Sequence, residues 1–331
     1  MLRSTKRFAW LAVTLAIFLS SGCDAGPKHV VTEQSVGRLF GVPPAEAKKS
    51  NAALPGEESD RGVRKYFPAI EVPDRCPRER IVVASWNAGN FGAKKSPEEI
   101  TAMADVLREA DIVVLQEIST TEFGTRAVAK LGDALSRTGS KWEIATSGAT
   151  QPKNAESEAY AVLWKPSKVF FDRRGSGLVA ELENGVSREP FKAAFLNSKR
   201  ERFSVYSFHA VPSNKKPKDE IAVISVSKEL TGAEKAVFAG DFNLSGTQAD
   251  AFLWKAGFRL SSTGKTSLKQ KPDERGNYRL HDFDHAYVKG FEICGSGIID
   301  FVERKFSPVT EESLKKARKI SDHLPVWVAV H

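Results

Sequence analysis

The chain has 331 residues, of which 41% are hydrophobic and 27% are charged, and its formal net charge is +8. These values are typical of a globular protein with a sizeable core, and the positive charge favours an anionic partner: nucleic acid, a phosphorylated substrate or an anionic membrane surface. The sequence has no internal repeat, no paired CxxC motifs, no Walker loop and no GxGxxG motif, so it lacks the signatures of several large nucleotide- and metal-binding classes.

Residues 1–23 have the pattern of an export signal. A basic start precedes an apolar run over residues 8–19, which is shorter than the about 20 residues needed to span a bilayer. The run leads into Ser20-Ser21-Gly22-Cys23, which resembles a bacterial lipobox with Cys23 as the lipidation site. We therefore expect a cell-envelope protein, lipid-anchored on the periplasmic side of the inner membrane or at the cell surface. An ordinary secretory signal with an incidental cysteine is the alternative, and the protein would then be secreted.

Residues 24–79 show little periodicity and are punctuated by prolines, which predicts a flexible tether. If Cys23 carries a lipid, only Cys76 and Cys294 remain. Two cysteines in an oxidising compartment predict a disulfide, and two buried free thiols are the alternative.

The globular domain is expected over residues 80–331, where short apolar runs alternate with amphipathic segments. Helices are predicted to begin at Ser96-Pro97 and to span about residues 121–136, 218–230 and 248–256. Strands are predicted at residues 81–87, 111–117, 142–146, 158–164, 169–171, 190–196, 203–208, 237–240, 283–288, 292–301 and 324–330. Because the strands outnumber the helices and several are hairpin-like neighbours, the pattern indicates a mixed α/β fold and not a plain βαβ repeat.

Polar side chains stand at the ends of many of these strands. They are Asn87, Glu117, His209, Asp241 with Asn243, and Asp322 with His323. Each alone could be a turn or capping residue. Ligands of α/β sheets bind at the carboxyl ends of strands, so together these residues indicate a site there.

The residue types suit one chemistry. Oxygen donors without cysteine select a hard cation such as Mg²⁺, for which Glu117 offers a carboxylate. Asn87 and Asn243 can bond phosphate oxygens without adding charge, imidazoles can move protons, and Arg188 can offset negative charge. The pattern predicts metal-assisted hydrolysis of a phosphate ester.

The motifs that carry these residues resemble the endonuclease/exonuclease/phosphatase superfamily. They are Trp86-Asn87, Gln116-Glu117, Gly240-Asp241-Phe242-Asn243 and Ser321-Asp322-His323-Leu324-Pro325, in the family's order over about residues 80–331. Finer matches resemble the DNase I branch: Glu158-Ala159-Tyr160, Lys165-Pro166, Ser187-Arg188-Glu189-Pro190, His209-Ala210-Val211-Pro212-Ser213 with Glu220-Ile221, and residues 317–325.

The resemblance implies a DNase I-like four-layer sandwich of two mixed β-sheets flanked by helices, with the site at the top edge between the sheets. It implies a catalytic set of His209, His323, Glu158, Asp284 and Asp241, in which Glu158 orients His209 and Asp284 orients His323. It implies phosphate or substrate binding by Asn87, Arg188, Asn243 and Tyr160. The implied metal ligands are Glu117, Asn87 and Asp322, for Mg²⁺ or alternatively Ca²⁺ or Mn²⁺. One histidine acts as general base and the other as acid, in an order that the sequence leaves open.

One departure bears on the substrate. DNA-cutting members of the DNase I branch often carry an arginine shortly after the metal-binding glutamate, where this chain has Ile118-Ser119-Thr120-Thr121. Basic stretches at residues 199–200, 215–218, 265–279 and 315–319 offer other phosphate contacts, or form a solvated face. We expect a monomeric, exported phosphodiesterase that cuts DNA. The alternatives are a phosphatase or a sphingomyelinase-like phospholipase acting on a lipid headgroup, and a non-catalytic surface binding protein.

Overall fold

The computed structural model describes residues 69–152 and 156–331. The expected signal segment, Cys23 and the expected tether up to residue 68 lie outside the described residues. Within the described part of the chain, no helix has the length and apolar character that crossing a bilayer requires.

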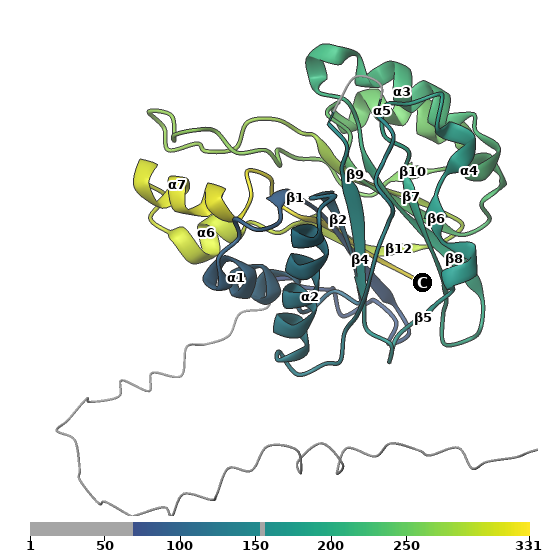
Figure 1. The fold of residues 1–331 in the computed structure, drawn as a ribbon, viewed down its shortest axis with the longest axis horizontal. Coiled ribbons are helices and arrows are strands. Elements are labelled where there is room, and N and C mark those ends of the chain that lie inside the picture. The colour runs from purple at the N-terminus through teal and green to yellow at the C-terminus, as the bar shows by residue number, and fades with distance from the viewer. Residues whose placement is uncertain (1–68, 153–155) are drawn as a thin grey trace, which may run out of the picture. The chain divides into compact units, whose positions relative to one another are not determined.

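The first sheet consists of β1 (Ile81–Phe91), β2 (Ile112–Ile118), β3 (Glu143–Thr146), β4 (Ala159–Trp164), β12 (Ile293–Ile298) and β13 (Val326–Val330). Their order across the sheet is β12-β13-β1-β2-β4-β3 (Figure 1). β1 and β2 pair in parallel, and the other neighbours pair antiparallel.

The second sheet consists of β5 (Phe170–Phe171), β6 (Gly177–Leu178), β7 (Phe191–Leu196), β8 (Arg202–His209), β9 (Ala236–Asp241), β10 (Arg259–Leu260) and β11 (Asp284–Lys289). Their order is β10-β11-β9-β8-β7-β5, and β6 also pairs with β7. Here β8 and β9 are the parallel pair. Both sheets are therefore mixed, as predicted.

Helices cover the outer face of each sheet. Figure 1 shows one group on one side of the paired sheets and the other group on the opposite side. The first group is α1 (Pro97–Leu107), α2 (Glu122–Ser136), α6 (Phe301–Phe306) and α7 (Glu311–Ile320), and the second is α3 (Pro217–Ser225), α4 (Lys228–Gly232) and α5 (Gly246–Leu253). The predicted four-layer sandwich is confirmed.

The layers explain why the strands read as continuous apolar runs. Successive side chains of a strand point to opposite faces of its sheet. In β1, Val82 and Ala84 join the cluster beneath the first group of helices, whereas Ile81 and Val83 join the cluster between the sheets. Since both faces are covered, apolar side chains predominate on both.

Capping residues explain where several of the elements begin or end, and they correct one predicted helix and one predicted strand. The predicted start of α1 is confirmed, because Ser96 and Glu99 form a reciprocal capping box with Pro97 at the first helical position. The single helix expected over residues 218–230 is instead two helices, α3 and α4. The Ser227 side chain caps the second of them by accepting a hydrogen bond from the Leu230 N–H (3.2 Å), which restarts the helix. The strand expected to reach residue 301 ends at Ile298, because Asp300 caps α6.

The end of the expected tether packs against the domain. Ile70 and Cys76 are buried in the same cluster as Cys294 and Trp327. Cys76 and Cys294 form the predicted disulfide, with their Cα atoms 5.2 Å apart. The described residues of this arm, from residue 69 onward, therefore pack against the domain through apolar side chains.

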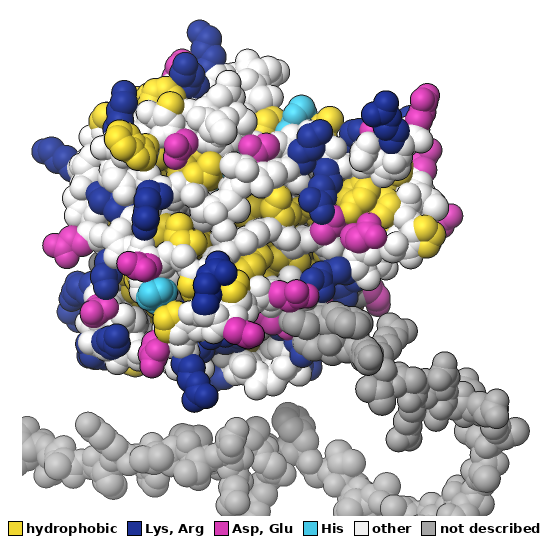
Figure 2. Space-filling view, turned by 180° about the vertical axis from the view of Figure 1, so that it is seen from behind, with side chains coloured by type: hydrophobic (Ala, Val, Ile, Leu, Met, Phe, Trp, Pro, Cys, Tyr) yellow, Lys and Arg dark blue, Asp and Glu magenta, His cyan; other side chains and the backbone are white. Residues whose placement is uncertain are grey.

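The charge on one face of the molecule is mixed. Figure 2 shows Lys and Arg side chains spread over this face and interleaved with Asp and Glu. The positive net charge of +8 is therefore not gathered into one patch on the face shown.

We expect loss of the disulfide to lower the stability of the fold. The bond joins residues separated by 218 positions. A cross-link lowers the entropy of the unfolded chain, and the effect is largest for long loops, so a disulfide typically adds about 2–4 kcal/mol to the stability of the folded state. Thermal unfolding with and without reductant measures this effect. The Tm of the wild type should fall on reduction, whereas the Tm of the Cys76→Ser/Cys294→Ser variant should already be low and insensitive to reductant.

Candidate active site

Three neighbouring strands of the second sheet place three predicted residues in a row. His209 ends β8 and pairs in register with Asp241, which ends β9. Asp284 begins β11 and pairs with Asp241 from the other side. The register of the sheet therefore fixes these three side chains at one edge, and all three residues are buried.

The first sheet supplies Asn87 from β1 and Glu117 from β2. The Asn87 amide Nδ2 donates to Glu117 Oε1 (2.9 Å) and to Asp241 Oδ2 (3.1 Å). A single carboxamide thus joins two acidic groups that belong to different sheets. The Asn87 amide therefore links the acidic edge of the first sheet to that of the second.

The backbone around the site is bent out of regular strand geometry. The register shifts between Asn87 and Phe91 where β1 pairs with β2, and between Leu115 and Ile118 where β2 pairs with β4. Asn90, Glu117 and Asn243 have positive φ values of 49°, 59° and 47°. Such a conformation costs a residue other than glycine about 1–3 kcal/mol and is common at functional sites. Here it brings the Glu117 carboxylate over the Asn90 N–H, which donates to Oε2 at 2.7 Å.

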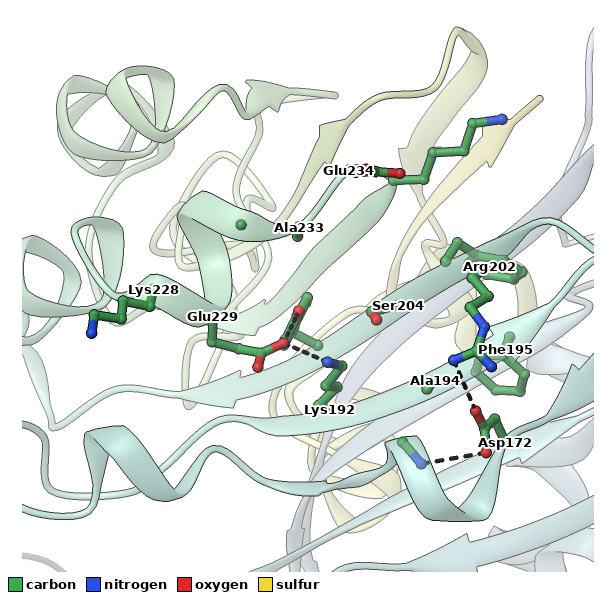
Figure 3. A pocket seen from close by; sticks show the side chains of 15 residues that line it. Asp172, Lys192, Ala194, Phe195, Arg202, Ser204, Lys228, Glu229, Ala233 and Glu234 are labelled. Atoms are coloured by element: carbon green, nitrogen blue, oxygen red, sulfur yellow. Dashed lines mark hydrogen bonds and ion pairs between the residues drawn. The ribbon is translucent and has the colours of Figure 1, made fainter.

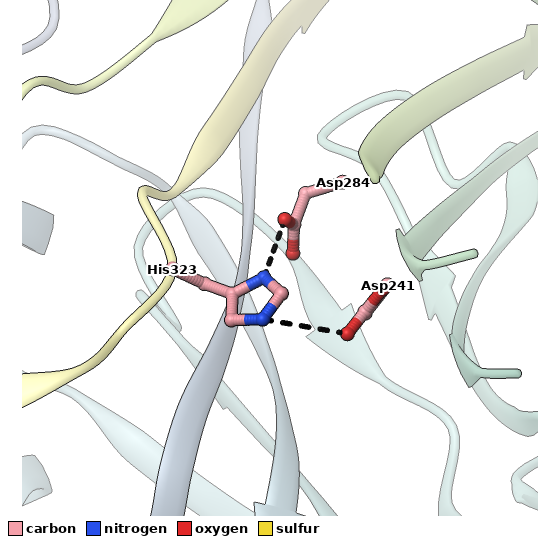
Figure 4. A group of neighbouring side chains, drawn as sticks. All are labelled: Asp241, Asp284 and His323. Atoms are coloured by element: carbon pink, nitrogen blue, oxygen red, sulfur yellow. Dashed lines mark hydrogen bonds and ion pairs between the residues drawn. The ribbon is translucent and has the colours of Figure 1, made fainter. Parts of the chain in front are cut away.

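One oxygen of Asp241 is shared by both histidines. His209 Nε2 lies 3.6 Å and His323 Nε2 lies 3.7 Å from Asp241 Oδ2. Figure 4 shows the His323 ring between Asp241 and Asp284. The other ring nitrogen of each histidine faces a different carboxylate: His323 Nδ1 is 2.7 Å from Asp284 Oδ2, and His209 Nδ1 is 2.9 Å from Glu158 Oε2. The two predicted orienting pairs are present in the structure.

His323 is also held through its main chain. The indole Nε1 of Trp86 donates to the carbonyl oxygen of His323 (2.7 Å). Ser321 Oγ accepts from the His323 N–H (3.0 Å) and donates to the Asn87 carbonyl oxygen (2.6 Å). These bonds fasten the loop after α7 to β1, and therefore to the first sheet.

Arg188 supports the other histidine. Its guanidinium donates to Glu158 Oε2 (3.0 Å) and to the carbonyl oxygens of His209 (3.1 Å) and Ala210 (2.7 Å). Arg188 is buried, with 6% of its surface exposed. The nitrogens of Arg188 therefore hold the Glu158 carboxylate and the backbone of His209 and Ala210.

The carboxylates make both imidazoles more basic. Burial acts to lower the pKa of His323, but Asp284 and Asp241 outweigh it and raise the pKa to about 10. Burial opposes protonation of His209 as well, and Glu158 nevertheless raises its pKa above the usual value, while Arg188 acts in the opposite direction. The two rings therefore sit in unlike electrostatic surroundings.

The remaining predicted residues lie at different distances from this centre. The Asn243 N–H donates to Asp241 Oδ1 (2.9 Å), and its side chain donates to the Ala210 carbonyl oxygen (3.2 Å). Asp322 pairs with Arg318 (3.3 Å) and its side chain is 46% exposed. Tyr160 is fully buried in the cluster between the sheets, which places the predicted substrate-binding side chain in the core.

Two sets of residues bear on a metal. Of the expected ligands, the structure brings Glu117 and Asn87 together, whereas Asp322 turns to Arg318. Asp241, Asp284 and His323 form another set, with ligand atoms within 4.8 Å of one another. Carboxylate and amide oxygens dominate both sets and thiolate is missing from both, so the residues fit a hard divalent cation.

Four positioning residues were not among the expected site residues. Trp86 and Ser321 act through the bonds given above. Glu220, on α3, accepts from the Ser187 N–H (2.6 Å) and the Val211 N–H (2.8 Å), so it ties the Arg188 segment to the segment after His209. Lys95 donates to the Lys319 and Ile320 carbonyl oxygens at the end of α7. Burial lowers the pKa of Lys95, opposed by the charges of Glu99, Asp322 and Glu117.

A separate cavity of about 370 Å³ lies beside β7, β8 and α4. Its charged groups pair with one another, as Figure 3 shows: Lys192 with Glu229 (2.6 Å) and Arg202 with Asp172 (3.6 Å). Tyr206 also donates to Glu229 (2.6 Å). These contacts have a structural explanation, and the cavity contains none of the predicted site residues.

Residues 84–323, which contain the whole site, match the sequence model of the Endonuclease/Exonuclease/phosphatase family. Proteins of this class are hydrolases that act on phosphoester bonds, and they typically use a divalent metal. The chain belongs to the endonuclease/exonuclease/phosphatase family, so the resemblance that its motifs predicted is confirmed. No curated protein matches the chain in sequence.

Several solved structures share the fold. TDP2 from D. rerio, complexed with a single strand DNA product, is 14% identical with a TM-score of 0.53, over 76% of this chain and 99% of that chain. A mannosyl-6-phosphatase from Bacteroides thetaiotaomicron VPI-5482 is 16% identical with a TM-score of 0.51, over 76% and 99% of the two chains. A family protein from Leptotrichia buccalis C-1013-b is 14% identical with a TM-score of 0.51, again over 76% and 99%. At these identities the likeness establishes the fold alone.

We expect the metal-free protein to lose stability as the pH rises from about 6.5 towards 10. The pKa of His323 is about 10 in the folded chain and about 6.5 for an unfolded histidine. Its protonation therefore adds stability that is complete below the unfolded pKa and is lost as the pH passes the folded pKa. Urea unfolding in EDTA across this range measures the loss. His323→Gln should show a smaller decline, and an equal decline in both proteins would contradict the expectation.

We expect Glu220→Ala to lower both stability and turnover. The change leaves two buried N–H groups without partners, each costing about 1–3 kcal/mol, and frees the segments that hold Arg188 and His209. Asp219→Ala is the matched control, because Asp219 is the exposed neighbour on the same helix. Urea unfolding and phosphodiester hydrolysis should separate the two variants, and wild-type behaviour of Glu220→Ala would show that Glu220 is not a positioning residue.

Proposed function

We propose that the chain is a divalent-metal-dependent phosphodiesterase that hydrolyses DNA by attack of water. Membership of a family of phosphoester hydrolases supports the reaction class. The net charge of +8 supports a polyanionic substrate. The cleft beside the site, described below, supports a substrate larger than a phosphate group.

The arrangement of the two histidines around Asp241 carries this proposal. Each ring has one nitrogen held by a carboxylate, at 2.7 Å for His323 and 2.9 Å for His209, and turns its Nε2 to the same oxygen of Asp241. A carboxylate at Nδ1 fixes the tautomer and orientation of an imidazole. Two oriented imidazoles at one site can serve as general base and general acid for one reaction.

In the proposed reaction one imidazole takes a proton from the attacking water, and the other gives a proton to the leaving oxygen. Asn87 and Asn243 keep the Asp241 carboxylate oriented through bonds to both of its oxygens. Arg188 holds the carbonyl oxygens of His209 and Ala210. Nearly all of these groups are buried, so the geometry exists before substrate arrives, and this preorganisation favours the transition state.

We propose Mg²⁺ as the cation. Glu117 would hold it, with Asn87 beside that carboxylate. Asp241, Asp284 and His323 are the alternative set of ligands. A bound divalent cation would stabilise negative charge that develops on the phosphoryl oxygens. Glu117 lines the open cleft, which leaves its carboxylate accessible to solvent.

A phosphatase or a sphingomyelinase-like phospholipase is the second candidate. The wall that follows Glu117 carries Ser119, Thr120 and Thr121 in place of a cation, which suits a less highly charged substrate. We also propose that the protein is exported and held at the cell envelope by a lipid on Cys23, since the N-terminal sequence has that pattern.

We expect His209→Ala and His323→Ala each to reduce hydrolysis of plasmid DNA by about 10²–10⁴-fold, the usual contribution of a general acid or base. His331→Ala is the control, because His331 is exposed at the far end of β13. Plasmid nicking with Mg²⁺, and again with EDTA, measures the effect. Near-wild-type rates in both active-site variants would refute the mechanism, and activity that survives EDTA would refute the metal requirement.

Bis(p-nitrophenyl) phosphate, sphingomyelin and phosphorylated sugars are assayed beside DNA. Hydrolysis of sphingomyelin or of a sugar phosphate, with DNA left intact, would replace the nuclease with the second candidate.

A further inference from the structure

A cleft of about 710 Å³ opens directly beside the proposed catalytic groups. Glu117, Glu158, Arg188 and His209 line its inner end. The volume lies within the range of pockets that hold whole small molecules, so it exceeds what a phosphate group alone requires. The outer end is built from segments that the reaction itself does not use.

One wall of the cleft is the turn from Ser119 to Thr121, between β2 and α2. Two glycines allow close approach to this turn: a Cβ on Gly124 would lie 1.9 Å from the Ser119 carbonyl oxygen, and one on Gly92 would lie 3.0 Å from Ser119 Cβ. Ser119 Oγ and Thr121 Oγ1 are also hydrogen-bonded (2.9 Å). The wall is therefore firmly held, and it presents hydroxyl groups without charge.

An aromatic ring stands at the rim of this wall. Phe123, in the first turn of α2, lines the cleft and is 47% exposed. Within residues 69–152 and 156–331, no aromatic ring stacks on it. Packing of α2 is already supplied by Val128, Leu131 and Leu135, which are fully buried. Packing within the described residues therefore does not explain why an aromatic ring is exposed at this position.

A cation lies across the same cleft. Lys94, in the loop after β1, lines the cleft and is exposed, and it forms no ion pair with any described residue. Glu156 is the acidic residue of the outer end. An aromatic face, hydroxyl groups and a free ammonium are the groups that recognise a base, a sugar and a phosphate in single-stranded nucleic acid.

We propose that this cleft binds one nucleotide of an unpaired strand next to the scissile phosphate, with its base on the Phe123 ring and its phosphate near Lys94. The proposal rests on the proposed function as a DNA-hydrolysing enzyme. A base within a duplex has both faces covered, so stacking on Phe123 requires a single-stranded segment. A lipid chain suits the cleft less well, because its walls alternate hydroxyl and charged groups with one ring.

The test is Phe123→Ala, assayed on a single-stranded oligonucleotide and on bis(p-nitrophenyl) phosphate, which has no base. The ratio of kcat/KM for the oligonucleotide to kcat/KM for the small diester should fall about tenfold, mostly through KM, in line with the usual effect of removing one stacking aromatic ring. Phe123→Trp should restore the ratio. Lys94→Ala should weaken oligonucleotide binding and make its logarithmic salt dependence shallower by about 0.7, the value for one phosphate contact on a single strand.

Phe170→Ala is the matched control, because Phe170 is 64% exposed on β5 and does not line the cleft. An unchanged ratio for Phe123→Ala in an enzyme that cuts DNA would overturn the subsite and leave the proposed function standing. A wild type that cuts no DNA would overturn both. Equal losses on both substrates would also overturn the subsite, because the ring would then support the catalytic centre. A loss confined to sphingomyelin vesicles would assign the ring to a lipid instead.

Discussion

One carboxylate oxygen, Oδ2 of Asp241, holds the two halves of the molecule in register. It accepts from Asn87 of the first sheet and faces the Nε2 atoms of His209 and His323. A buried charge is costly unless several donors satisfy it, and only 2% of Asp241 is exposed. If the two sheets are not correctly placed, this oxygen loses Asn87 and His323 and keeps only His209 of its own sheet.

A second polar link beneath the site reinforces that constraint. Gln116 on β2 donates to Ser85 of β1 (3.1 Å) and to Ser207 of β8 (2.8 Å), inside an otherwise apolar interior. Polar groups in a core lose little when fully paired and much when misaligned. The buried polar groups and the positive φ values of Glu117 and Asn243 lower the stability of the fold but set the geometry of the site. The apolar clusters on both faces of each sheet offset this loss.

Much of this could be predicted from the sequence, because strand ends and family motifs are local. Asn87, Glu117, His209 and Asp241 follow apolar runs in the sequence, and His323 directly precedes one. The pairing of Glu158 with His209 and of Asp284 with His323 could be predicted only from the family motifs, because the paired residues lie 51 and 39 positions apart.

The residues that sequence reasoning missed act through contacts that no local pattern encodes. Glu220 belongs to a motif that the sequence showed, but its bonds to backbone N–H groups 33 and 9 positions away could not be inferred from it. Arg188 was expected to contact or support the phosphate site, and the sequence did not show that its nitrogens bond to Glu158 and to two main-chain oxygens. Tyr160 was assigned from its motif, whereas its position in β4 turns it into the interior.

The arm that precedes β1 has a mechanical consequence. Cys76 is bonded to Cys294 on β12, whereas β1 begins only five residues after Cys76 and carries Asn87. A pulling force applied through the N-terminal segment would reach Cys76 first and would divide between β1 and the disulfide. The bond thereby diverts load into β12 at the border of the sheet, and the strand that aligns the catalytic groups bears less of it.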